Sequence, residues 1–163
     1  SEFMARASNE IFQPRVKPIN IAHLKETAIT SYDHVVQMIK DGQLGALNVL
    51  HGIEGKVARI GSFDGLPFTQ QNLIALQRGA LLNAINHNYY QACKGWEDDR
   101  GNVAALHTLL HRLDAFAELN DGALPSKAHG LRFDESDLMP MVRDMNTWRQ
   151  PSSPAYRAAL GLH

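Results

Sequence analysis

Two histidines one helical turn apart are the residues best suited to chemistry in this chain. His107 and His111 stand at positions i and i+4 of an apolar-periodic segment, so both side chains lie on one face of the helix predicted there. Asp114 and Glu118 continue that face toward the end of the helix. Imidazole nitrogens and carboxylate oxygens are ordinary ligands of zinc and iron. His87, on the preceding predicted helix, would supply a third ligand and leave one position open for a metal-bound water.

This pattern supports a metal-dependent hydrolase as one hypothesis, with zinc or iron as the cofactor and Glu118 or Asp114 as a further ligand or general base. The competing interpretation is structural. The histidine face lies roughly 120° from the centre of the leucine stripe of the same helix, where solvent is expected. A chain with eight histidines also produces this spacing by chance. The sequence therefore favours no bound cofactor, and the hydrolase is the alternative.

The single cysteine is a second candidate for catalysis. Cys93 would need a base to form its thiolate, and His87 with Asn83 or Asn86 is the nearest set in the sequence. Six positions separate His87 from Cys93, however, so their side chains point to different sides of one helix. A lone cysteine near a helix end more often serves packing, and without a second cysteine an internal disulfide is excluded.

An aromatic residue followed by charges is the third candidate, and it points to binding rather than catalysis. Trp96 opens a charged run that includes Asp98, Asp99 and Arg100, in a segment predicted to be a loop over 96–101. Exposed aromatic side chains beside charges are favoured anchors of protein–protein contacts. In the alternative interpretation the tryptophan folds back onto the end of the bundle. The acids then remain solvated and favour the positive end of the next helix.

Charge and composition exclude several classes of function. No phosphate-binding glycine loop, dinucleotide fingerprint, nucleophile elbow or paired-cysteine zinc motif is present. The formal net charge is -1 and the 16 basic residues are scattered, so no basic face for nucleic acid is apparent. No apolar run is long enough to cross a bilayer, and no secretory signal is visible. We expect a soluble protein without membrane contacts, either cytoplasmic or exported without a cleaved signal peptide.

The elements that must position these side chains are predicted to be helices, because apolar residues recur at intervals of three and four along most of the chain. Residues 1–19 are expected to form a flexible arm, whose first three residues resemble a cloning scar. The alternative to helix near 56–63 is a small β element, since glycines interrupt the helical period just before it. The predicted helices cover 20–29, 32–40 with Ser31 as its cap, 44–60 as one helix or two half-helices, 70–94, 103–119, 136–148 and 155–160.

The predicted fold is all-α: a compact single-domain bundle of about five to six helices over 20–163. Helices 70–94 and 103–119 form its central antiparallel hairpin, because the connection between them is short. Apolar residues cover more than half the circumference of helix 70–94, so we expect neighbours on several of its sides. The favoured function is a helical protein–protein interaction module, such as a bacterial regulator, adaptor or effector domain, whose partner is another protein.

Overall fold

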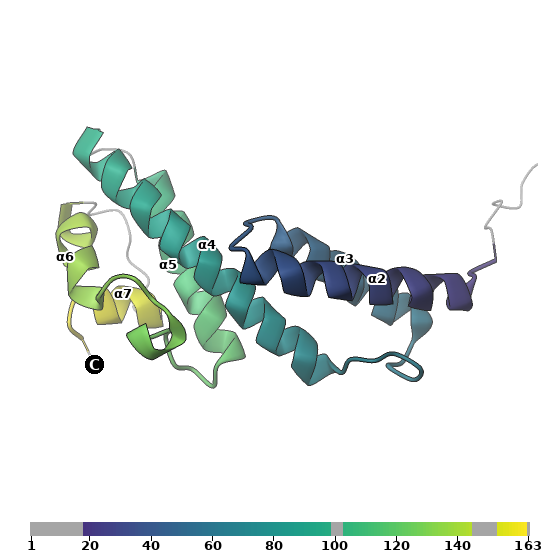
Figure 1. Ribbon diagram of the computed structural model, residues 1–163. Coiled ribbons are helices and arrows are strands. Elements are labelled where there is room, and N and C mark those ends of the chain that lie inside the picture. Colours follow the sequence, from purple (N-terminus) through teal and green to yellow (C-terminus); the bar gives the residue numbers. More distant parts are fainter. Residues whose placement is uncertain (1–17, 99–102, 145–152, 163) are drawn as a thin grey trace, which may run out of the picture.

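Helices are the only regular elements among the residues that the structure describes. The structure is a computed structural model that describes residues 18–98, 103–144 and 153–162 (Figure 1). The predicted all-α, single-domain bundle of five to six helices is confirmed, and the small β element near 56–63 does not form, because residues 56–60 complete a helix. The elements are α2 (Ile21–Lys40), α3 (Ala46–Ile60), α4 (Gln70–Asp98), α5 (Ala104–Leu119), the 3-10 turn η1 (Lys127–His129), α6 (Glu135–Asp144) and α7 (Pro154–Ala159).

The first helix is longer than predicted. Asn20 caps α2, its side-chain Oδ1 accepting a hydrogen bond from the backbone N–H of His23 (3.1 Å). The helix then runs through Ser31, which was expected to cap a separate second helix. Leu24, Ala28 and Val35 are buried along one side of it. This continuous apolar stripe, packed against α3, outweighs the local preference of serine for a helix start.

The glycines of α3 do not interrupt it. Gly52 and Gly55 are exposed, and a Cβ atom added at either would meet nothing within 4 Å. These glycines therefore destabilise the helix only through the low helix propensity of glycine. The burial of Leu50 and Ile53 on the opposite face offsets this loss of stability. The helix ends at Gly61, whose φ of 90° belongs to the left-handed region that glycine adopts without strain.

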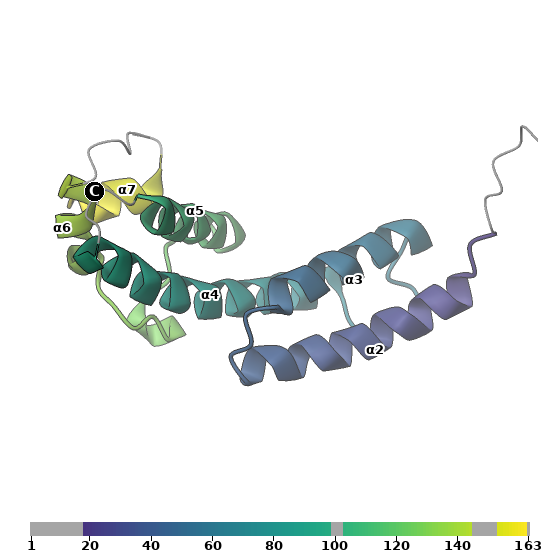
Figure 2. The same ribbon diagram turned by 90° about the horizontal axis from the view of Figure 1, so that it is seen from above.

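The central hairpin of α4 and α5 forms as predicted, and α4 is its longer member. Thr69 caps α4 through a reciprocal pair of hydrogen bonds: the amide of Asn72 donates to Thr69 Oγ1 (3.2 Å), and the amide of Thr69 donates to Asn72 Oδ1 (2.8 Å). Gly95 does not stop the helix, which continues to Asp98. Figure 2 shows the α2–α3 hairpin on one end of α4 and α6 with α7 on the other.

Two clusters of buried side chains lie along α4. The smaller cluster joins α2 and α3 to the first half of α4, and includes Phe68 and Leu73. The larger cluster joins the second half of α4 to α5, α6 and α7, with Ile85 and Phe116 among its fully buried members. Leu47 packs against both clusters. Both halves of the bundle therefore depend on α4.

Polar side chains of α4 hold the ends of two neighbouring helices. Arg78 Nη1 donates to the carbonyl of Leu119 at the end of α5 (2.8 Å), and Asn83 Nδ2 donates to the carbonyl of Ile39 near the end of α2 (3.0 Å). One turn before Asn83, Gly79 allows close approach, because a Cβ atom there would lie 3.2 Å from the Ile39 side chain. Carbonyl groups that lack a partner within their own helix are thus satisfied by α4.

Two asparagines further along α4 bind the other half of the bundle. Asn86 Nδ2 donates to the carbonyl of Gly130 (3.1 Å), and its Oδ1 accepts from the amide of Arg132 (2.9 Å), which fixes the segment after η1. Asn88 is 5% exposed, and its Oδ1 accepts from the guanidinium of Arg112 on α5. Buried amides at a helix–helix contact need such partners, so these residues specify how the helices dock.

The C-terminal helices match the prediction in part. α7 starts as predicted, with Pro154 at its first position and Ser153 Oγ accepting from the amide of Tyr156 (3.1 Å). α6 begins one residue early, because Asp137 Oδ2 accepts from the amide of Asp134 (2.8 Å). The predicted end of this helix near 148 and most of the predicted arm over 1–19 lie outside the described residues. Over the described ranges, none of the helices combines the length and apolarity required to span a membrane.

Candidate functional site

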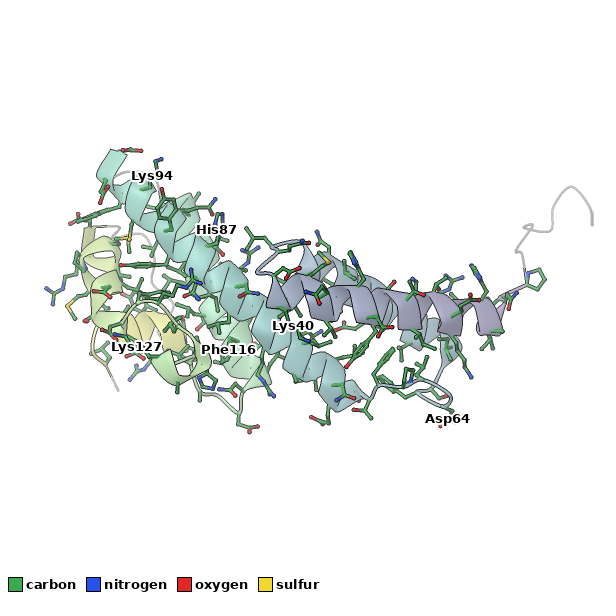
Figure 3. The ribbon with its side chains drawn as sticks, in the orientation of Figure 1. Lys40, Asp64, His87, Lys94, Phe116 and Lys127 are labelled. Carbon is green, nitrogen blue, oxygen red and sulfur yellow. The ribbon has the colours of Figure 1, made fainter. Side chains whose placement is uncertain are left out.

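The histidine pair lies on α5, beside the buried leucine stripe of that helix. His111 is exposed and His107 is half-buried. Both were predicted to point away from the core; the exposure of His111 agrees with that geometry, whereas Nε2 of the half-buried His107 is buried. His87 lies on α4 with an exposed side chain (Figure 3). In the ranges 18–98, 103–144 and 153–162, no three His, Cys, Asp or Glu side chains gather where they could hold a metal ion. The zinc or iron site therefore stays a hypothesis without an assembled ligand set.

His111, Asp114 and Glu118 do line one cavity, of about 560 Å³, which α5 shares with the start of α7. Both oxygens of the Asp114 carboxylate already accept hydrogen bonds there. Its Oδ2 accepts from Ser153 Oγ at 2.6 Å, and its Oδ1 accepts from the amide of Ala155 at 2.9 Å. Asp114 therefore holds the first turn of α7 against α5, which is a structural role. Glu118 is the carboxylate that remains exposed at this cavity.

The cysteine has an aromatic neighbourhood rather than a catalytic one. Cys93 is half-buried, one turn after Tyr89 on α4. Tyr89 in turn stacks on Phe133, with ring centroids 4.2 Å apart. Burial raises the pKa of Tyr89 above its ordinary value of 10.0, and Cys93 and the charge of Asp137 raise this pKa further. His87, the base that cysteine catalysis would require, is exposed and six positions away on the helix.

The binding segment predicted from Trp96 is helical as far as it is described. Trp96 lies within α4, packs half-buried against the larger cluster, and donates from Nε1 to Asp144 Oδ2 on α6 (2.8 Å). The predicted loop is thus wrong for 96–98, because this contact with α6 extends α4 past Gly95. Asp98 is exposed at the end of α4. Asp99 and Arg100 lie outside the described residues, so the predicted docking role of the whole set stays a prediction.

A groove that the sequence analysis did not anticipate lies across the first half of α4. We call it the α4 groove; it has a volume of about 480 Å³. α3 and α5 each pack on α4, and residues of all three helices line the groove. Ile74 on the floor is only half-buried. The residues that line the groove are Glu54, Val57, Ala58, Phe63, Gln70, Leu73, Ile74, Gln77 and Leu119.

One signal in the sequence was consistent with this groove. The apolar face of helix 70–94 is wider than a single neighbour requires, and Leu73 and Ile74 point to different sides of it. Leu73 belongs to the smaller buried cluster, whereas Ile74 lies beyond that cluster and faces the groove. Comparisons with known protein families, with curated proteins and with solved structures found no match. The argument for function therefore depends on the residues of this chain.

Proposed function

We propose that the protein is a helical protein–protein interaction module that binds its partner in the α4 groove. The observation that carries this proposal is the apolar lining of the groove, to which α4 and two helices that both pack on α4 contribute residues. Six of its nine lining residues are apolar, and the polar ones are two glutamines and one glutamate. Concave apolar surfaces with a few polar groups at the rim are typical of binding sites.

The way α4 is held supports the same proposal. The floor of the groove belongs to a helix whose polar side chains fasten α2, α5 and the segment after η1. Its walls come from α3, whose Leu50 and Ile53 are buried, and from the end of α5, which Arg78 holds. A groove between fastened helices is largely pre-formed. A partner would therefore lose little binding free energy to ordering of this surface.

The test compares a groove variant with a matched surface variant. The immobilised protein and its Ile74→Asp and Tyr90→Asp variants are exposed to a lysate of the source cells. Tyr90 is 63% exposed on α4 and does not line the groove, so it controls for loss of any exposed apolar side chain. We expect a protein retained by the parent and by Tyr90→Asp, and lost by Ile74→Asp. Equal retention by all three would contradict the proposal.

The control for folding is thermal. Ile74 is half-buried, so an aspartate there partly buries a charge and lowers stability as well as blocking binding. Gln77→Arg changes the rim of the groove without burying a charge, and it should reduce retention with an unchanged melting temperature. If retention of the partner correlates with the melting temperature of each variant, and not with whether the substituted residue lines the groove, the proposal is also contradicted.

A metal-dependent hydrolase is the second candidate, and a specific observation favours it: His111 and Glu118 face one cavity. In this proposal His107 and His111 are ligands, with His87 as the third, and Glu118 is the general base. The test is metal analysis of the extensively dialysed protein and of the His107→Ala, His111→Ala double variant. About one zinc or iron per chain, lost in the variant, would support the hydrolase. Equal, trace amounts of metal in the parent and in the double variant would rule out the metal-dependent hydrolase.

A further inference from the structure

We propose that the occupant of the α4 groove is an amphipathic helix of another protein, with apolar side chains on the groove floor and a basic side chain facing Glu54. This inference rests on the proposed function, which states only that a protein binds there. It is argued from the chemistry of the lining residues, from the all-helical surroundings, and from the one charge that faces the groove.

The surroundings of the groove favour a helix over other peptide conformations. The described residues form no strand, so they offer no sheet edge that an extended peptide could join. Polyproline segments dock between aromatic rings, and Phe63 is the single aromatic lining residue. Phosphorylated segments need clustered arginines, and no arginine lines the groove. Helix-in-groove binding is the peptide-recognition mode that fits this lining.

The shape of the groove agrees with this choice. Its lining residues belong to α3, to α4, to the loop at Phe63 and to the end of α5 at Leu119. A fourth helix laid between the walls would continue the packing that the bundle already uses. The volume of about 480 Å³ is that of a site for a drug-sized ligand, so it admits several apolar side chains at once. Leu73, Ile74 and Leu119 would contact them.

The charge that the occupant must carry follows from Glu54. Glu54 on α3 is the charged residue among the lining residues, with its side chain 42% exposed and its carboxylate 3.9 Å from the ring of His51. The opposite wall is the C-terminal end of α5 at Leu119, where the guanidinium of Arg78 donates to the Leu119 carbonyl (2.8 Å) and compensates the negative end of the helix dipole. The charge preference of the groove therefore comes from Glu54. A lysine or arginine on the occupant is favoured at this groove, and a glutamate is disfavoured.

The experiment uses the full chain and two designed probe peptides. The peptides share one leucine stripe with helical spacing and differ only in their flanking residues, which are lysines in one and glutamates in the other. Fluorescence anisotropy measures both affinities at low and at high salt. We expect the lysine peptide to bind about fivefold more tightly, a preference that an exposed ion pair supplies and that salt reduces. Glu54→Lys should reverse the preference, and Tyr90→Asp should leave it unchanged.

The outcomes separate this inference from the proposed function. Equal affinity of the two peptides, or a preference that Glu54→Lys does not alter, would overturn the assigned charge. No binding of either peptide, while lysate capture remains sensitive to Ile74→Asp, would overturn the helical occupant and leave the proposed function standing. Concentration-dependent self-association that Ile74→Asp abolishes would identify a second copy of this chain as the occupant and also overturn the inference. If neither peptide binding nor capture depends on the groove, both proposals fail.

Discussion

The carboxylate of Asp114 should contribute more to stability than any other exposed or half-buried charge described on α5. Its two oxygens accept hydrogen bonds from Ser153 Oγ and from the amide of Ala155, at the first turn of α7. Ser153 is 4% exposed and Ala155 is 1% exposed, so neither donor has ready access to water. In Asp114→Ala both donors lose their acceptor, and one of them is an orphan amide of a helix start.

The expected cost follows from these two donors. Leaving a buried donor unsatisfied costs about 1–3 kcal/mol. The cavity of about 560 Å³ beside Asp114 lets water replace part of the lost interaction. We therefore expect Asp114→Ala to lower the free energy of unfolding by about 2–3 kcal/mol, toward the lower end of the sum. For a chain of 163 residues this corresponds to a fall in melting temperature of about 4–12 °C.

The assay is a double-mutant cycle measured by urea unfolding. Asp114→Asn keeps one acceptor oxygen and should lose only about half as much stability as Asp114→Ala. Ser153→Ala removes the helix cap as well as the donor, and should cost about 1–2 kcal/mol alone. Because Asp114 and Ser153 share a hydrogen bond, the double variant should be less destabilised than the sum of the single variants, by about 1 kcal/mol. Strict additivity, or an Asp114→Ala variant as stable as the parent, would refute this reasoning.

Three further substitutions test other parts of the fold. Trp96→Phe should cost about 1 kcal/mol in urea unfolding, because the indole N–H loses its carboxylate on α6. Unchanged stability would show that this hydrogen bond contributes nothing to the packing of α4 on α6. Gly79→Leu should cost about 1–3 kcal/mol by forcing Ile39 away from α4, whereas Gly52→Ala, on the open side of α3, should add about 0.5–1 kcal/mol. The opposite order would contradict the described α2–α4 contact. Since burial raises the pKa of Tyr89, the contribution of this residue to stability should be constant below pH 10 and fall above it, and Tyr89→Phe should flatten that fall.

The helical fold was predictable because its main signal is local. Leucine periods, the cap at Thr69 and the Ser153-Pro154 start are short-range patterns, and the structure confirms the hairpin of α4 and α5 that they predict. The errors occur where a distant partner overrides a local preference. Ser31 lies inside α2 because α3 covers the apolar stripe of that helix. Likewise, α4 passes Gly95 because Trp96 reaches Asp144, 48 residues later in the chain.

The candidate site was less predictable than the fold, because the partners of its residues are distant in sequence. The spacing predicts His107, His111, Asp114 and Glu118 on one face of α5, and three of them, His111, Asp114 and Glu118, line one cavity. It gave no indication that Ser153 would occupy the Asp114 carboxylate, since this contact spans 39 positions. A helical period shows which side chains share a face, but the packing of another element decides which of them remain available for chemistry.

The α4 groove was likewise not predictable from a local sequence pattern. Its lining residues extend from Glu54 to Leu119 and come from three helices and a loop, so no short motif marks it. What the sequence does carry is Ile74, an apolar residue of α4 that is named in neither buried cluster. Its side chain is half-buried and lines the groove. A half-buried apolar side chain in a groove lined by other helices is what we expect of a helix that binds a further helix. The preference between the lysine and glutamate peptides, which Glu54 sets, tests this interpretation directly.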